Sequence, residues 1–368
     1  MYPSTSQKYR LLEMVALCGE FPADQLTRLI PSPSYGEKLI TELKAQKLLR
    51  THYRDHLRGY RLTGRAKQML LAQNPERFRD FLTGNTETNQ VRSEVTRRLR
   101  LYQKAETYLT LLSAGIPFFA DQKPDIFRKD REAGILSMGN LPLFYSSREF
   151  KHIGPEATKI RNSRSIGVLL APHCAYALYN TGDHVLKWEY RTEVRLNAFL
   201  QYYLQDFPYA GHPQVRAILT GKDMDTAYQL LTSTGGYKKS LFIADTSYEH
   251  FHYLPNTPEG ETLLKLLVRP RLMKQLDQLL LSDLDSRKPD LPIDHDGVDA
   301  SGNPAVLAYD FDLHRINRFN TGLNVYGRKG VMICFDFQIP CLKRYLTADI
   351  RFSSIDLSKF RKGFLHEP

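Results

Sequence analysis

Long apolar runs are missing from this chain of 368 residues, and its first ten residues are mostly polar. No run reaches the roughly 18 residues that a membrane-spanning helix needs. The longest candidate, IGVLLAPHCAYALYNTG, is interrupted by Pro172 and His173. The N-terminal segment MYPSTSQKYR is polar, which argues against a secretory signal. We therefore expect a cytoplasmic protein that has no membrane partner.

Cysteine is also scarce, with four residues that form no CxxC pair: Cys18, Cys174, Cys334 and Cys341. This usage predicts reduced and mostly buried thiols rather than a disulfide framework. A structural zinc site needs clustered ligands, so none is expected. The sequence gives no reason to expect any other cofactor.

Acidic residues are outnumbered, with 40 Asp or Glu against 51 Lys or Arg and a formal net charge of +11. Such an excess suggests a polyanionic partner, with nucleic acid first, although a well-solvated basic surface is the alternative. The charge is uneven, because residues 1–72 contain 12 Lys or Arg against 6 Asp or Glu, a net charge of +6. This location favours phosphate contact by the N-terminal segment.

The first seventy residues predict three helices, a two-stranded hairpin and a closing helix. Residues 8–18 have apolar side chains at helical spacing, and Gly19 ends that helix. Pro22 suits the first turn of the second helix, PADQLTRLI. The third helix is predicted to begin at Ser34, with Glu37 completing a capping box. Its apolar residues Leu39, Ile40 and Leu43 are expected to face inward.

The segment LLRTHYRDHLRGYRLT predicts two short strands joined by the polar turn DHLRG. Thr63 is then expected to cap the closing helix GRAKQMLL. Three helices, a β-ribbon and a closing helix together indicate a winged helix-turn-helix, whose third helix enters the major groove of DNA.

The predicted DNA contacts lie on the outward face of the third helix and on the ribbon. They are Ser34, Tyr35, Lys38, Thr41, Arg50, His52, Arg54, His56, Arg58 and Arg61. A winged helix used only for protein pairing is the alternative.

Residues 1–73 are thus assigned to this domain, and residues 74–115 to a linker followed by a long amphipathic helix. Within residues 91–114, Val95, Leu99, Tyr102 and Leu109 trace an apolar stripe, and Arg98 is expected near the polar side with three other arginines. Those arginines are expected to be solvated, or to extend the DNA footprint or pair two subunits.

Residues 116–368 alternate strand and helix signals and predict a mixed-sheet α/β or α+β domain, with a possible subdivision near residues 255–290. SIGVLLA and AYALYNT predict a buried hairpin. Further strands are predicted at DHVLKWEY, VRAILTG, SLFIAD and GVMICFDF. LPIDHDGVDASGNPAVLAYDFDL predicts a second hairpin. Trp188 is expected in the core.

Four carboxylates on that second hairpin are the candidate catalytic residues: Asp294, Asp296, Asp310 and Asp312. Gathered on adjacent strands, they could hold Mg²⁺, which a nuclease uses to activate water. The PD-(D/E)xK pattern, however, needs a Lys where Asp312 stands. We therefore favour a polar hairpin tip, with Asp312 capping the next helix. His250 and His252 share a strand face, but the sequence shows no third metal ligand near them.

The segment from Tyr9 to Leu71, which includes GYRLTGRAKQML, resembles the winged-helix region of replication-relaxation-type proteins of bacterial plasmids and conjugative elements. The resemblance is strongest over residues 8–72. It implies a DNA-binding role in replication, mobilisation or gene control of a mobile element, and a second domain that has been compared with nuclease folds.

Three hypotheses follow. The first is a homodimeric double-stranded DNA-binding accessory or regulatory protein, whose second domain senses, pairs or recruits. The second is a metal-dependent nuclease or nicking enzyme, and Mg²⁺ is expected only in that case. The third is a protein-interaction adaptor that uses a winged helix without DNA contact.

Overall fold

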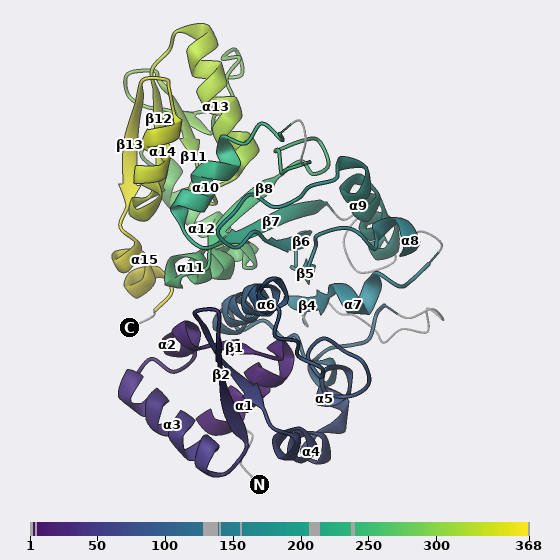
Figure 1. Ribbon diagram of the computed structural model, residues 1–368. Coiled ribbons are helices and arrows are strands. Elements are labelled where there is room, and N and C mark those ends of the chain that lie inside the picture. The colour runs from purple at the N-terminus through teal and green to yellow at the C-terminus, as the bar shows by residue number, and fades with distance from the viewer. Residues whose placement is uncertain are drawn as a thin grey trace. The chain divides into compact units, whose positions relative to one another are not determined.

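The computed structural model describes residues 3, 6–127, 139, 141–154, 157–205, 214–236 and 240–366 (Figure 1). The chain divides into two compact units, Met1–Asp125 and Ile126–Pro368. Helices combine with antiparallel and mixed sheets, which confirms the predicted α+β class. Among the described helices, none is long and apolar enough to cross a membrane. All four cysteines are buried and free, as predicted.

The first unit consists of helices around a three-stranded antiparallel sheet of order β1-β3-β2. Its elements are α1 (Gln7–Cys18), β1 (Phe21–Pro22), the 3-10 helix η1 (Ala23–Gln25), α2 (Leu26–Leu29), α3 (Pro33–Ala45), β2 (Leu49–Arg54), β3 (Leu57–Leu62), α4 (Gly64–Gln73), α5 (Pro75–Leu82), α6 (Val95–Ser113) and the 3-10 helix η2 (Ala120–Gln122).

Helix α1 supplies the centre of this unit's core. Ser6 caps it by accepting a hydrogen bond from the Tyr9 amide at 3.2 Å, and Gly19 ends it with a φ of 75°, which favours glycine. The predicted inner face is confirmed, because Leu11 and Val15 are fully buried together with their neighbours.

Helix α3 lies beside β2 and buries Leu39, Ile40 and Leu43, as predicted (Figure 1). The predicted cap at Ser34 was wrong, since the helix begins at Pro33 after the cap residue Ser32, and Ser34 lies in its first turn. The fixed φ of proline is preorganised for the first helical position, which makes the proline a better start than a serine cap.

Strands β2 and β3 form the predicted hairpin, which we call the ribbon (residues 49–62). Asp55 and His56 alone connect the strands, and both have positive φ (52° and 58°), as a two-residue type I′ turn requires. Thr63 caps α4 as predicted, accepting from the Ala66 amide at 3.2 Å.

Residues 74–115, predicted as a linker and a helix, lie within the first unit, whose boundary falls at Asp125. Helices α5 and α6 both pack on α1. The predicted stripe on α6 was partly wrong, since Val95 and Leu99 are 39% and 43% exposed. The buried face runs instead through Arg98, Leu101 and further residues, because a buried carboxylate is the partner of Arg98.

The second unit contains two five-stranded sheets. The first comprises β4 (Leu143–Ser146), β5 (Gly167–Leu170), β6 (Ala175–Asn180), β7 (Val215–Gly221) and β8 (Phe251–Pro255), with α7 (Ser147–Phe150), α8 (Ala157–Ile160), α9 (Tyr190–Leu204) and α10 (Met224–Leu231). The second comprises β9 (Asp285–Ser286), β10 (Gly297–Val298), β11 (Pro304–Leu307), β12 (Gly330–Phe335) and β13 (Ile350–Ile355), with α13 (Leu313–Tyr326), the 3-10 helix η4 (Asp336–Gln338), α14 (Ile339–Tyr345) and α15 (Leu357–Phe364). Helices α11 (Pro258–Leu267) and α12 (Pro270–Leu281) lie between them in the chain.

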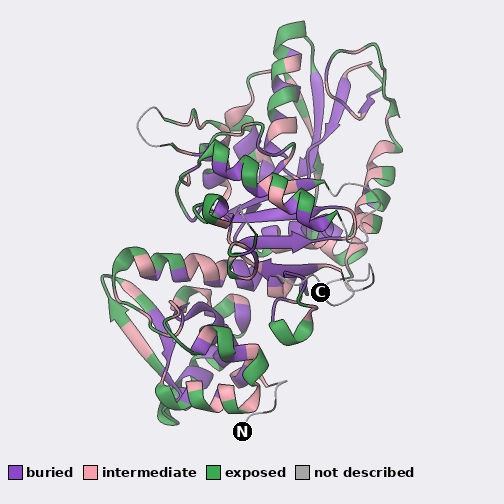
Figure 2. Cartoon of the chain, turned by 90° about the vertical axis from the view of Figure 1, so that its right-hand side faces the viewer, coloured by how far each residue is buried: buried purple, intermediate pink, exposed green. Residues whose placement is uncertain are grey.

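Both sheets follow one plan. Three strands pair antiparallel in chain order, and two further strands are added in parallel after helices. The crossover helices are α9 and α10 in the first sheet and α13 and α14 in the second. Figure 2 shows the inner strands of both sheets buried, and one apolar cluster combines residues of both. Parallel strands require such crossovers because their ends lie far apart.

Two predicted strands in this unit were wrong. Residues 183–190 and 240–245 share a single bridge, Lys187 to Leu241, and α9 begins at Tyr190. Their apolar side chains serve packing instead, since Trp188 contacts Phe242 and Phe251 edge-on, with ring centroids 5.1 and 5.8 Å apart. Trp188 is therefore a core residue, as expected.

Candidate nucleic-acid interface

The tip of the ribbon presents basic and aromatic side chains to solvent. Arg54 and Arg58 are exposed on opposite faces, and Tyr53 beside them is 67% exposed. Arg54 lies 3.4 Å from Asp55, an exposed pair that contributes little free energy in water. His56, at the turn, is also exposed. Arg50 is exposed nearer the base of the ribbon.

The predicted contact residues of α3 all lie on its exposed face. Ser34, Lys38 and Thr41 are exposed, and Tyr35 is 44% exposed. The Thr41 hydroxyl donates to the Glu37 carbonyl at 2.9 Å, so it can offer a partner its methyl group or its oxygen as an acceptor. Helix α3 and β2 are in contact, which places these four side chains and the ribbon on neighbouring elements.

Arg61 does not belong to this surface, and its prediction as an exposed contact was wrong. Its side chain is 5% exposed, and its guanidinium pairs with the Glu20 carboxylate at 2.7 Å. A second bond runs to the Arg92 carbonyl at 3.3 Å. Alternation along β3 places Arg61 on the covered face of the ribbon, where a buried carboxylate compensates its charge.

Arg98 of α6 is fully buried and binds the same carboxylate, with a shortest nitrogen–oxygen distance of 2.6 Å. It also donates to the carbonyls of Arg54 at 2.6 Å and Leu57 at 2.9 Å, the two residues that flank the ribbon's turn. Burial raises the pKa of Glu20, but hydrogen bonds from Arg98 and Arg61 outweigh it and lower the pKa below its ordinary value. The ribbon is thereby fastened to α6.

Gly59 makes this arrangement possible. A Cβ at that position would collide with the Glu20 carboxylate and lie 2.7 Å from the Tyr102 hydroxyl. Glu20 was not among the residues predicted from the sequence. Its one signal was an acid in the apolar segment between Cys18 and Phe21.

His52 faces the same side as Arg61 and is half-buried. Burial lowers its pKa, and the charges of Arg61 and Arg98 lower it further, so His52 adds no positive charge at neutral pH. The charge that the ribbon shows to a partner therefore comes from Arg50, Arg54 and Arg58.

Three of the four candidate catalytic carboxylates in the second unit, Asp294, Asp296 and Asp310, act electrostatically on the guanidinium of Arg315. Asp294 and Asp296 precede β10 rather than lying on a strand, and they pair with arginines of α13: Arg318 at 3.3 Å and Arg315. Asp312 caps α13, as favoured, by accepting from the His314 amide at 3.1 Å.

Asp310 and Asp312 each pair with a histidine: His252 lies in β8, and His250 directly precedes that strand. These two pairs were not predicted from the sequence. His250 Nδ1 lies 2.6 Å from Asp312, and His252 Nδ1 lies 3.4 Å from Asp310. The imidazole rings of His250 and His252 are stacked, with centroids 6.0 Å apart. Within the described residues, no three candidate ligands are placed to hold a metal ion.

Comparison with known proteins gave no match: no family model, no curated protein and no solved structure is detectably similar to this chain.

Proposed function

We propose that the first unit is a winged helix-turn-helix that binds double-stranded DNA, with α3 as the recognition helix and the ribbon as the wing. The element order α1-β1-α2-α3-β2-β3 and the sheet order β1-β3-β2 support this. In such domains the recognition helix lies in the major groove, which is about 12 Å wide and admits one helix.

The observation that carries the proposal is the exposed, cationic tip of a ribbon that buried ion pairs with Glu20 hold in place. Arg54 and Arg58 are free to reach phosphates, while Arg98 fixes the backbone beside them. A wing that is already ordered loses less conformational entropy on binding. On α3, Lys38 can contact a phosphate or a guanine, and Tyr35 can stack or pack.

The biological role remains part of the proposal. The likeness of residues 8–72 to replication-relaxation-type proteins suggests an accessory or regulatory factor of a mobile element. A symmetric homodimer would read two half-sites about one helical turn apart.

Selection of bound duplexes from a random DNA pool, using the full chain, tests this proposal. We expect a convergent motif and an affinity that falls linearly with salt on logarithmic axes. Arg54→Ala with Arg58→Ala should reduce the slope of that line by about 2, because each phosphate contact contributes about 0.9. Lys359→Ala is the control, since this lysine lies in the second unit and its side chain is 86% exposed.

Two other results would favour one of the alternative functions over DNA binding without cleavage. Unchanged affinity after the ribbon changes and Lys38→Ala would favour the adaptor hypothesis. Mg²⁺-dependent cleavage that disappears in Asp310→Ala would favour the nuclease.

A further inference from the structure

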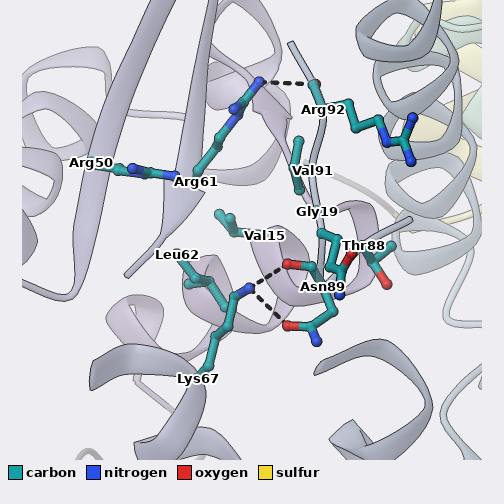
Figure 3. A pocket seen from close by; sticks show the side chains of 11 residues that line it. Val15, Gly19, Arg50, Arg61, Leu62, Lys67, Thr88, Asn89, Val91 and Arg92 are labelled. Carbon is teal, nitrogen blue, oxygen red and sulfur yellow. Dashed lines mark hydrogen bonds between the residues drawn. The ribbon is translucent and has the colours of Figure 1, made fainter. Parts of the chain in front are cut away.

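A cavity of about 310 Å³ lies at the base of the ribbon, on the side covered by residues 88–92 (Figure 3). Val15 and Gly19 contribute its apolar part, and the ends of β2 and β3 and the first turn of α4 complete the lining. Its volume is at the lower end of the range for small-molecule pockets. It is therefore large enough for a small polar group.

Three cations from three different elements reach this cavity: Arg50 from β2, Arg61 from β3 and Lys67 from α4. Arg50 and Arg61 are paired across the ribbon and share a face. Arg92 also lines the cavity, but Figure 3 shows its side chain turned away, with its carbonyl oxygen accepting from Arg61. No described lining residue is an aspartate or a glutamate.

The positive charge at this place is only partly neutralised. Glu20 pairs with Arg61, but Arg98 shares the same carboxylate, so one negative charge serves two positive ones. Lys67 donates to the carbonyl and side-chain oxygens of Asn89 at 2.5 and 2.8 Å, and both acceptors are neutral. Like charges directly opposite on paired strands are unfavourable, so Arg50 beside Arg61 adds to the imbalance.

The ionisation of Lys67 reflects this environment. Burial lowers its pKa, and the charge of Arg50 lowers it further. An anion in the cavity would offset both effects, since it would add the counter-charge that Asn89 does not provide.

The donors also suit one class of anion. Lys67 has three ammonium hydrogens, two of which go to Asn89, and the remaining one is available. The guanidinium of Arg50 offers a planar fork that matches the oxygens of a phosphate. Arg61 contributes positive charge but no hydrogen bond to the anion, because its donors already bind Glu20 and the Arg92 carbonyl.

We propose that this cavity binds a phosphate group through Arg50 and Lys67. The group belongs either to a free phosphate compound or to the backbone of bound DNA, and the chemistry of recognition is the same. A bound phosphate connects β2 and α4, and so stabilises the base of the ribbon. The site is distinct from the exposed tip formed by Arg54 and Arg58.

Thermal unfolding of the full chain in inorganic phosphate, compared with chloride at equal ionic strength, tests for a free phosphate. At ten times the dissociation constant, the Tm of the first unit's transition should rise by about 5 °C, because that unit has about 125 residues. Arg50→Gln and Lys67→Gln should abolish this rise, whereas Arg65→Gln, an exposed base on α4, should retain it. Arg50 is exposed, so its variant provides the test even if the Lys67 variant fails to fold.

A duplex titration of the same variants tests for a backbone phosphate. If phosphate leaves Tm unchanged but Arg50→Gln and Lys67→Gln each reduce the salt slope by about 1, the occupant is a DNA phosphate. A rise in Tm that survives loss of duplex binding in the Arg54 and Arg58 variant supports the cavity independently of the DNA proposal. No response in either assay, or equal responses in all variants, overturns the proposal.

Discussion

Glu20 determines that two arginines, Arg61 and Arg98, are buried and not exposed. Arg61 and Arg98 would both be counted as surface bases from sequence, yet each is buried against this carboxylate. A buried arginine is tolerated only when a counter-charge and further acceptors are present. Here Glu20 provides the charge, and the carbonyls of Arg54 and Leu57 receive the remaining donors of Arg98.

We therefore expect Glu20→Ala to lower the free energy of unfolding by about 3–5 kcal/mol, because it leaves two buried guanidiniums uncompensated. Urea unfolding measures the change. Glu37→Ala, which removes an exposed carboxylate on α3, should alter stability by less than about 0.5 kcal/mol. Equal effects of the two variants would contradict the buried pairing.

Asp312 makes stability depend on pH. Burial raises the pKa of this carboxyl, but the hydrogen bond from His250 and the charges of His252 and His250 outweigh it and lower the pKa to about 2. A folded-state pKa below the unfolded value means that the unfolded chain binds the proton more readily. The stabilisation is thus present above the ordinary value of 3.8 and is lost as pH falls toward 2.

Asp312→Asn keeps a good helix cap but removes the charge. We expect the wild type to be more stable than this variant near neutral pH, and the difference to shrink as the pH falls below about 4. Urea unfolding at several pH values measures it, with Asp283→Asn, an exposed carboxylate, as the control. A constant difference across that range would show that the charge of Asp312 is not what stabilises the fold.

The ribbon is the element on which the proposed function depends, and its turn is not built from the best residues. Asp55 and His56 both adopt positive φ, which costs about 1–2 kcal/mol for most non-glycine residues and less for these two types. Asn-Gly is the preferred pair in a type I′ turn.

Replacing Asp55→Asn and His56→Gly together should therefore raise the free energy of unfolding by about 1 kcal/mol. Gln68→Gly, at an exposed site in α4, is the matched control and should lower it by about 1 kcal/mol. Urea unfolding of the three proteins decides the matter. A loss of stability in the turn variant would mean that the turn has another geometry.

In the second unit, strand-like composition does not always produce a strand. Residues 183–190 and 240–245 have strand-like composition but share only one bridge, because their aromatic side chains pack around Trp188. A short apolar run alone does not distinguish a strand from a loop whose side chains fill the core. The hairpin of β5 and β6, by contrast, was predicted correctly, since two such runs flank a tight connection.

At the scale of the whole molecule, the chain consists of two units with separate cores. The first has about 125 residues, which is a common domain size, and buries its own apolar residues from α1 to α6. The second repeats one sheet plan twice, and the equivalent helices α10 and α14 pack on each other. There, Arg344 pairs with Asp225 at 2.9 Å.

We expect a fragment of residues 1–125 to unfold cooperatively in urea and to bind duplex DNA with the salt slope of the full chain. The reason is that the α3 surface, the ribbon and the Glu20 pairs all lie within it. Circular dichroism and fluorescence anisotropy measure the two properties. The fragment of residues 126–368 serves as the comparison, and duplex binding by it alone would contradict the proposed location of the interface.

The sequence by itself determined the local elements of the first unit: α1 with its glycine end, the apolar face of α3, the hairpin and the Thr63 cap. These follow from periodicity and capping, which act between residues close in the chain. Only the tertiary structure decided which bases are exposed. Arg61 meets Glu20 across 41 residues and Arg98 meets it across 78, and His250 meets Asp312 across 62. Burial of a charge depends on a distant counter-charge, and no local pattern encodes that distance.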